Sequence, residues 1–343
     1  MQSPDVRTGR YTLVAQMHDG DAAELFRARV DGVCGFEKFI MLKRLPPELA
    51  QDEAARRRFI RQAVICSKLC HHNVVGVYDF YQEGGGFYLA MELVDGTSLA
   101  TLLSHQRHAQ QAFSLTATLS IVLQLLDALD YIHKARDPIS YARLELVHRD
   151  LRPDNVMVDR SSVTKLIGFG HCHVEGNEDE ERIDPPSRYA SPESLEGERP
   201  TTASDIFSAG ALLFEMLTLK PLIPESATSL EEIRRAHQDV DTRLELVPSA
   251  FQAIRPILKR ALAGDPTDRY PSACVMSRDL RTHQWPVTGV LSPDQVIREA
   301  VESARQWDED RRTVDPVGQE EEATEDDITP ELTSDLTPAE EEM

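Results

Sequence analysis

One short polar segment offers the sequence's clearest capacity for chemistry. Residues 148–155 read His148-Arg149-Asp150-Leu151-Arg152-Pro153-Asp154-Asn155, and apolar runs at 144–147 and 156–158 flank them. The segment combines an imidazole, two guanidinium groups, two carboxylates and a carboxamide, which are groups that transfer protons and bind charged ligands. Such side chains between two apolar runs are candidates for an active-site loop.

Other motifs stand in a fixed order around this segment. Ile40-Met41-Leu42-Lys43 and Met91-Glu92-Leu93-Val94 precede it, and Ser191-Pro192-Glu193, Asp205 with Ile206-Phe207-Ser208-Ala209-Gly210, and Arg269 follow it. They resemble, in turn, the V-A-I-K strand, the adenine hinge, the A-P-E motif, the helix that braces the catalytic loop, and the arginine that pairs with the A-P-E glutamate. Residues 148–155 resemble the catalytic loop H-R-D-x-x-x-x-N. Over residues 11–285 the chain therefore resembles the eukaryotic-like (Hanks-type) Ser/Thr protein kinases that also occur in bacteria.

The resemblance implies a role for each matching residue. Asp150 stands at the position of the catalytic base and Lys43 at that of the lysine that holds the α- and β-phosphates. Arg152 and Asn155 occupy further catalytic positions, and Asn155 is the candidate metal ligand. The ATP-binding positions are Gly20, Leu25, Lys43, Met91, Glu92, Val94 and Met157. The structural positions are Arg149, Glu193, Asp205 and Arg269.

The elements that must position these residues fall into two groups. Apolar runs at 11–17, 25–30, 36–45, 74–81 and 86–93 predict strands, with a turn at 18–21, and the spacing at 51–70 predicts one helix among them. From residue 98 onward the period changes to 3.6, with strong amphipathic helices at 115–135 and 204–219. The expected fold class is α+β, a two-lobed protein-kinase-like fold with a small strand-rich N-lobe and a larger helical C-lobe.

The expected domain boundaries follow from these patterns and from the resemblance. Residues 1–10 form an N-terminal extension, and 11–285 form the kinase-like domain, with the N-lobe at 11–95 and the C-lobe at 96–285. Ser292-Pro293-Asp294 resembles an N-cap followed by proline in the first turn, which predicts a C-terminal helix within 286–307. Residues 308–343, the acidic tail, lack aromatic residues and are expected to be disordered.

The chain departs from the family pattern at the position that matters most for metal binding. The segment after Lys165-Leu166-Ile167 reads Gly168-Phe169-Gly170, whereas the family has D-F-G. Glycine has no side chain that could ligate a cation, and a hard divalent ion keeps its waters unless oxygen ligands replace them. If metal stabilisation supplies several kcal/mol, its loss slows phosphoryl transfer by a factor on the order of 10²–10⁴.

Four other departures point the same way. Gln62 replaces the helix glutamate that pairs with Lys43, and the glycine-rich loop reads His18-x-Gly20-x-x-Ala23, which keeps one glycine of three. Met41 replaces a small alanine above the adenine ring. Pro186 replaces the threonine that touches the catalytic aspartate in the family. As to cofactors, these changes predict that ATP binds weakly and that Mg²⁺ binding is disfavoured.

Three clusters of charged or metal-type residues leave alternatives open. The acidic run 178–181 either is a solvated loop, the more ordinary interpretation, or supplies carboxylates to Arg149 in place of a phosphate. Cys66, Cys70, His71 and His72, and the run 171–173, hold zinc-type ligands at close spacing but match no known zinc pattern. A structural role for His71 is the better interpretation, because the kinase family places a histidine there.

Composition narrows the classes of partner and compartment. The fractions of hydrophobic (41%) and charged (28%) residues exclude a wholly disordered chain, and five cysteines without a C-x-x-C pair argue against a disulfide framework. The net charge is −21, and residues 307–343 hold 15 acidic and two basic residues. This sign disfavours nucleic acid and anionic membranes as partners, and no apolar run predicts a membrane helix. A cytoplasmic location is expected.

The acidic tail contains two copies of a short motif. Residues 327–330 read D-I-T-P and residues 335–338 read D-L-T-P. The ordinary interpretation is a solubilising tail. The alternative is a docking motif for other proteins, such as an active kinase that phosphorylates its threonines or a domain that binds phosphothreonine.

Two functions compete. The first is a pseudokinase, a kinase-fold regulator or scaffold that binds other proteins and retains at most weak, metal-independent ATP binding. The second is an active Ser/Thr kinase that transfers the γ-phosphate of ATP to protein hydroxyls, with Asp150 as base and an unrecognised ligand in place of the missing carboxylate. Retention of Lys43, Asp150 and Asn155 favours the second, whereas Gly168 and Gln62 favour the first.

Overall fold

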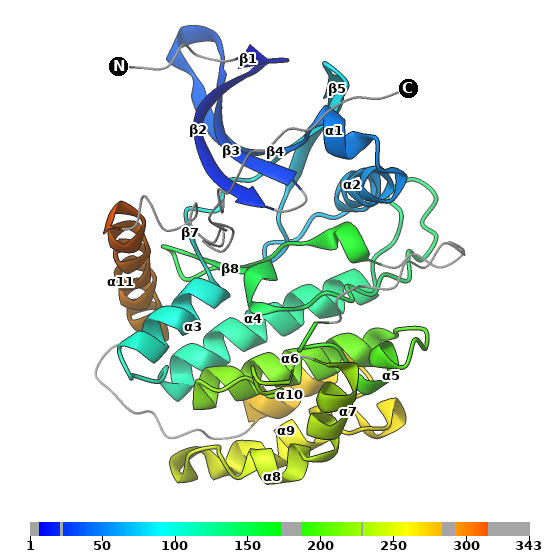
Figure 1. Ribbon diagram of the computed structural model, residues 1–343, viewed down its shortest axis with the longest axis vertical. Coiled ribbons are helices and arrows are strands. Elements are labelled where there is room, and N and C mark those ends of the chain that lie inside the picture. Colours follow the sequence, from blue (N-terminus) through cyan, green and yellow to red (C-terminus); the bar gives the residue numbers. More distant parts are fainter. Residues whose placement is uncertain (1–6, 21–22, 173–186, 228, 283–291, 315–343) are drawn as a thin grey trace, which may run out of the picture.

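The computed structural model describes residues 7–20, 23–172, 187–227, 229–282 and 292–314. Figure 1 shows a small upper lobe, in which helices lie beside a curled sheet, above a larger helical lobe. The expected two-lobed α+β fold is confirmed.

The upper lobe contains an antiparallel sheet of strand order β1-β2-β3-β4-β6-β5. The strands span Arg7–Thr8 (β1), Tyr11–Gly20 (β2), Ala23–Asp31 (β3), Glu37–Leu45 (β4), Val77–Glu83 (β5) and Gly86–Met91 (β6). The helices are α1 (Pro47–Ala50) and α2 (Glu53–Cys66), and the Asp52 carboxylate caps α2 by accepting a hydrogen bond from the Ala54 N–H.

The two faces of this sheet carry separate apolar clusters. Ile40 and Leu42 of β4 pack in a small outer cluster with Tyr11 and Tyr88. Successive side chains of a strand point to opposite faces, so Met41 and Lys43 lie on the other face, toward the lower lobe. The sequence thereby delivers Lys43 to the space between the lobes.

Two strand boundaries differ from the prediction. Residues His18–Gly20 were expected in a turn, but β2 continues to Gly20, which pairs with Ala23 of β3. β5 begins at Val77 and not at residue 74. Val74 instead makes an isolated bridge to Leu166 in the lower lobe. The start of the apolar run 74–81 therefore lies at the junction of the lobes, and only its later part belongs to the sheet.

The lower lobe is a stack of helices with a small sheet on top. The sheet comprises β7 (Gly96–Ser98), β8 (Val156–Asp159) and β9 (Thr164–Leu166), in that order. The helices are α3 (Leu99–His108), α4 (Leu115–His133), α5 (Pro192–Leu195), α6 (Thr202–Thr218), α7 (Leu230–Gln238), α8 (Val240–Leu244), α9 (Arg255–Ala261) and α10 (Ala273–Thr282). The two amphipathic helices predicted from the sequence, α4 and α6, form its centre.

Helix α4 is apolar over most of its circumference. By length and composition alone it could cross a membrane, so the expectation that no segment reaches that threshold was wrong. In the structure 61% of its most apolar window is buried, and the helix packs on α6, α10 and α11. Such packing is that of a core helix in a globular lobe.

The C-terminal helix α11 spans Pro293–Val314. The predicted cap is present, because the Ser292 hydroxyl accepts a hydrogen bond from the Gln295 N–H (3.3 Å). The helix ends at Val314 and not at Trp307, so residues 308–314 are helical rather than part of a disordered tail. It lies beside α3 and β7 (Figure 1) and buries Ile297, Val301 and Ala304.

Helix α7 places an imidazole in the interior of the lower lobe. His237 contacts the Phe207 ring edge-on at 5.2 Å, and neither ring nitrogen has a hydrogen-bond partner among the described residues. Burial, together with the nearby Arg269 charge, lowers the pKa of His237 to about 4. Between pH 4 and about 6.5, His237 is therefore mostly neutral in the folded protein and mostly protonated in the unfolded chain.

Because of His237, we expect the stability of the protein to fall at acidic pH. As pH falls from about 6.5, the unfolded chain takes up a proton at His237 and the folded chain does not, so the free energy of unfolding should fall by up to about 3 kcal/mol by pH 4. His237→Phe should flatten this loss between pH 6.5 and 5, as measured by urea unfolding across pH. Equal pH dependence in both proteins would show that His237 is not responsible.

Candidate active site

The catalytic-loop segment is held from below by one buried carboxylate on α6. Asp205 accepts hydrogen bonds from the His148 N–H (2.8 Å), the Arg149 N–H (2.9 Å) and His133 Nε2 (2.8 Å). Arg149 has a φ of +69°, a region that non-glycine residues rarely adopt. The hydrogen bonds from the two successive N–H groups stabilise this turn, so Asp205 fixes the path of the loop that carries Asp150.

The environment of Asp205 favours its charged form. Burial alone would raise its pKa, but the His133 hydrogen bond and the nearby imidazoles outweigh burial, and the pKa of Asp205 is lowered. The carboxylate therefore stays ionised at neutral pH.

A stack of buried groups joins the loop to the upper lobe. His148 is fully buried, its Nε2 lies 2.8 Å from the Ile167 carbonyl oxygen, and its ring meets the edge of Phe169 at 5.0 Å. The short helix Phe169–His171 in turn packs against α2. Contacts thus run from α2 through Phe169 and His148 to Asp205 on α6.

Gly168 adopts a conformation that only glycine tolerates easily. Its φ is +87°, and a Cβ atom built there would lie 2.3 Å from Asn155 Oδ1 and 2.4 Å from Asn155 Cγ. A Cβ atom essentially never makes non-bonded contacts this short. The Asn155 carboxamide therefore occupies the space in which the side chain of any other residue at 168 would begin.

Asn155 is also bound to Asp150. Its Nδ2 group donates to the Asp150 carbonyl oxygen (2.7 Å) and to the Asp150 Oδ2 atom (2.9 Å). One oxygen of the candidate base therefore already accepts a hydrogen bond from the candidate metal ligand. The pair rigidifies the loop and directs the Asn155 amide toward Asp150.

Lys43 is half-buried and has no carboxylate partner among the described residues. Its ammonium donates to Gln62 Oε1 (2.9 Å), and it lies 5.6 Å from the centre of the Phe59 ring. Burial lowers the pKa of Lys43, and burial also raises the pKa of the neighbouring Cys66 thiol to about 12, so that thiol stays neutral. The ammonium is thus surrounded by neutral groups.

The expected ATP-binding residues lie on neighbouring elements between the lobes. Leu25 pairs with Lys43 across β3 and β4, Met41 pairs with Met91 across β4 and β6, and Met157 lies on β8. At the hinge, the Glu92 carboxylate binds the Lys165 ammonium (2.8 Å) and the Gly76 N–H (3.1 Å). Ala23 is buried, Val94 is half-buried, and Gly20 ends β2.

The Glu193–Arg269 pair is buried. From residue types alone, a pair of this kind would ordinarily be interpreted as a surface ion pair. Two hydrogen bonds, of 2.7 and 2.8 Å, join the guanidinium to the carboxylate. Arg269 also donates to the carbonyl oxygens of Ala203, Ala263 and Gly264. Burial alone would raise the pKa of Glu193, but hydrogen bonds from Arg269 and Ser204 outweigh it and lower the pKa.

Comparison with known proteins decides the family. The model of the protein kinase domain matches residues 19–285. The chain belongs to the protein kinase family.

Several of its relatives are bacterial kinases. The chain is 28% identical to the serine/threonine-protein kinase PknD of Chlamydia pneumoniae, over 83% of this chain and 32% of that protein. It is 30% identical to a probable serine/threonine-protein kinase of Streptomyces coelicolor (82% and 41%) and 29% identical to PrkC of Bacillus subtilis (80% and 40%). The chain spans less than half the length of these relatives.

Membership in the kinase family implies ATP as ligand and usually Mg²⁺. The residues at the metal position do not fit a resident divalent cation. Gly168 offers no side-chain ligand atom, Asn155 offers a single neutral carboxamide oxygen while its Nδ2 group donates to Asp150, and no group of three or more His, Cys, Asp or Glu residues suited to a metal occurs among the described residues. Lys43, by contrast, suits a phosphate group.

A substitution tests the neutral setting of Lys43 in this kinase domain. Gln62→Glu should raise the free energy of unfolding at pH 7 by about 1–2 kcal/mol, because it gives the partly buried ammonium a counter-charge. Gln62→Met, which keeps the volume but removes the acceptor, should lower it by about 1–3 kcal/mol. Chemical denaturation checks both, and equal stability of the two variants would contradict this description of Lys43.

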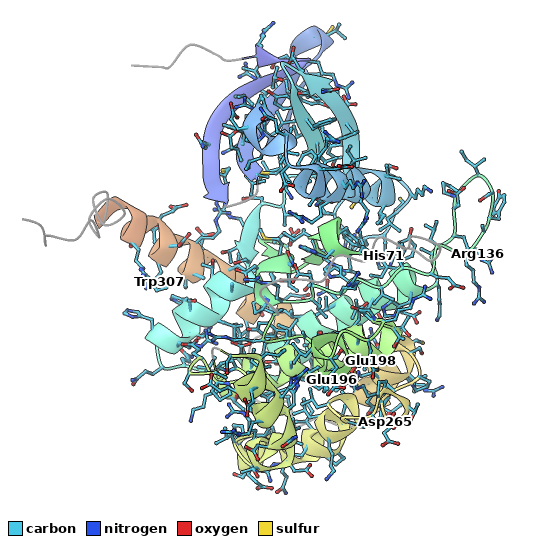
Figure 2. All side chains as sticks on the ribbon, turned by 45° about the vertical axis from the view of Figure 1, so that its right-hand side comes forward. His71, Arg136, Glu196, Glu198, Asp265 and Trp307 are labelled. Atoms are coloured by element: carbon cyan, nitrogen blue, oxygen red, sulfur yellow. The ribbon has the colours of Figure 1, made fainter. Side chains whose placement is uncertain are left out.

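The remaining predicted residues have different outcomes. Arg152 is half-exposed and pairs with Asp154 (2.8 Å) at the rim of a groove. Pro186, residues 178–181, His173 and the tail motifs lie outside the described residues. His71 stacks on Tyr131 at 4.7 Å and accepts a hydrogen bond from the Asn73 N–H (3.1 Å), which agrees with a structural role. Figure 2 shows His71 at the junction of the lobes.

Sequence reasoning missed two features of the site. The sequence suggested Cys66 only as a metal-type residue. In the structure its thiol interacts electrostatically with the Lys43 ammonium. Its position four residues after Gln62 places both on one face of α2, which could have indicated this. The occupation of the Gly168 space by Asn155 carries no signal in the sequence, because it depends on a side-chain rotamer.

Proposed function

We propose that this protein is a pseudokinase-type regulator or scaffold, with phosphoryl transfer absent or much reduced. The observation that supports this most is the pairing of Gly168 with Asn155. One candidate metal ligand is missing, and the other fills the vacated space and binds the candidate base. The cleft therefore has no carboxylate at residue 168 to hold a cation against the phosphates.

The expected deficit is large. In kinases the metal ions bridge the β- and γ-phosphates and neutralise the charge that develops during transfer. Loss of several kcal/mol of this stabilisation corresponds to a rate lower by a factor on the order of 10²–10⁴. Such a protein acts through binding and conformation.

Weak nucleotide binding without metal is part of this proposal. A partly buried ammonium with a neutral partner gains more from an anionic ligand than one already paired with a carboxylate, so Lys43 favours a phosphate group. Met41 and Met91 lie together on adjacent strands, and their flexible side chains can adapt to a purine.

A melting-temperature series tests the binding function. A ligand that binds only the folded state raises stability by RT ln(1 + [L]/Kd). We expect ATP to raise the melting temperature slightly with EDTA present, and no further rise with Mg²⁺ or Mn²⁺. Lys43→Met, a matched loss of charge, should remove the shift. A shift that appears only with Mg²⁺ would contradict the proposal.

An active Ser/Thr kinase is the alternative. Lys43, Asp150 and Asn155 are retained, and the buried contacts from α2 to Asp205 are complete. Phosphoryl transfer to protein hydroxyls that Asp150→Asn removes would support this function over the first.

Partners and location remain part of the proposal. The expected partners are other proteins, such as an active kinase or a domain that binds phosphothreonine in the acidic tail, and the expected location is the cytoplasm. The net charge of −21 is unfavourable for nucleic acid and for anionic membranes. Pull-down with the full chain and with tail threonines replaced by valine would test the tail's role.

A further inference from the structure

A groove of about 350 Å³ opens on the lower lobe between α3, residues 152–154 and residues 187–189. Its apolar lining comes from Ala100 and Leu103 of α3 and from Pro153. Leu103 and Pro153 are themselves buried, so the floor is fixed by the core. A volume of about 350 Å³ leaves room for a short aliphatic side chain over this floor.

The rim of the groove carries more positive than negative charge. It holds Arg107, Arg152, Arg188 and the carboxylates of Asp154 and Glu215. Arg107 binds Glu215, which also accepts a hydrogen bond from the Tyr189 hydroxyl (2.6 Å), and Arg152 binds Asp154. Both carboxylates are therefore already paired.

Arg188 differs from the other two arginines. Its guanidinium donates a hydrogen bond to a neutral acceptor, the Glu225 carbonyl oxygen (3.1 Å). Its charge is thus not balanced by a carboxylate of the groove lining. In a chain of net charge −21, a concave site with excess positive charge favours an acidic segment.

The acidic tail supplies a segment of matching chemistry. Residues 327–330 and 335–338 each place an aspartate directly before an isoleucine or leucine, within a strongly acidic stretch. A carboxylate next to an aliphatic side chain is complementary to Arg188 beside the floor formed by Ala100, Leu103 and Pro153. Two copies of the motif double the chance of engagement.

Helix α11 delivers the tail to the neighbourhood of the groove. Trp307 packs against His105 and His108 of α3, at 5.8 and 5.7 Å between ring centres, and Figure 2 shows it between α11 and the lower lobe. Ala100, Leu103, Ser104 and Arg107 form the adjacent face of the same helix, which lines the groove.

The length of chain after α11 is sufficient. Asp327 lies thirteen positions after Val314, and a segment of this length can span up to about 40 Å. The path around α3 to the groove is shorter than this, because a helix with its side chains is only about 10–12 Å in diameter.

From these observations we propose that the acidic tail docks in cis in this groove, with Asp327 or Asp335 on Arg188 and the following Ile328 or Leu336 on the apolar floor. The tail then covers the groove between α3 and residues 187–189 against other acidic peptides. Because no nucleotide or metal takes part, docking stands or falls independently of the function proposed above.

The test uses full-length protein and a fluorescein-labelled peptide of residues 321–343, followed by fluorescence anisotropy. A tail variant carries Asp327→Ser, Ile328→Ser, Asp335→Ser and Leu336→Ser. The peptide should bind this variant at least about tenfold more tightly than it binds wild type, because the wild-type tail competes at high effective concentration. Adding salt should weaken binding.

Groove variants locate the site. In the tail variant, Arg188→Glu or, independently, Arg152→Glu should weaken peptide binding by about tenfold or more. The matched control Arg278→Glu, on the exposed side of α10, should leave it unchanged. Equal peptide binding by wild type and tail variant, no binding by either, or insensitivity to both groove substitutions would overturn the proposal. A concentration-dependent dimer of the wild type that accounts for the competition would also overturn docking in cis.

Discussion

Replacing Arg269 with alanine is expected to lower the free energy of unfolding by about 3–5 kcal/mol. The side chain of Arg269 is fully buried, and Glu193 is 6% exposed, so the substitution leaves a carboxylate in the interior without its partner. Three carbonyl oxygens lose their donor as well. Urea unfolding at pH 7 measures the change.

An exposed ion pair provides the control for this prediction. Arg281 binds Asp127 at 3.0 Å, but both side chains are about half-exposed. Arg281→Ala should therefore cost less than about 1 kcal/mol. The loss from Arg269→Ala should also shrink at low pH, because Glu193 has a lowered pKa in the folded state and its stabilisation is lost as pH falls through that pKa. Similar costs for the two arginines would contradict the buried network.

Gly168→Ala is expected to lower the free energy of unfolding by about 2–4 kcal/mol, the second large effect. A non-glycine residue at φ +87° is strained, and the added Cβ would displace Asn155 and disturb its hydrogen bonds to Asp150. Thermal and chemical denaturation measure the loss.

The neighbouring glycine is the matched control for Gly168. A Cβ at Gly170 meets nothing within 4 Å, so Gly170→Ala should change stability by less than about 0.5 kcal/mol. Equal costs at the two positions would contradict the close packing of Asn155 on Gly168. For the same steric reason, Gly168→Asp alone should not create phosphoryl transfer, because Asn155 blocks the carboxylate and Gln62 remains.

The sequence predicted the fold through its motif order and its periodicity. Helices α4 and α6 were predicted from apolar spacing alone, and the cap at Ser292 was predicted from residue types. Errors occurred where one segment serves two environments. Val74 contacts the lower lobe before β5 begins. Helix α11 continues past Trp307, and because its last turns are polar, their residue types do not distinguish them from the tail.

The candidate site was predictable in its parts but not in its arrangement. Residue types located Lys43, Gln62, Asp150, Asn155 and Gly168, and the structure places them between the lobes. The motif order also paired Glu193 with Arg269, but only the structure reveals that the pair is buried. The contact between Asn155 and the Gly168 backbone, and the neutral thiol beside Lys43, depend on rotamers and burial, which a sequence does not specify.

Transfer of the γ-phosphate from labelled ATP in the presence of Mg²⁺, to the protein itself and to a general protein substrate, tests the central claim most directly. Asp150→Asn, purified in the same way, controls for contaminating kinases. The absence of a metal-binding carboxylate at residue 168 predicts that the wild type transfers no more phosphate than Asp150→Asn. Transfer by the wild type at a rate usual for bacterial Ser/Thr kinases, and lost in Asp150→Asn, would contradict it.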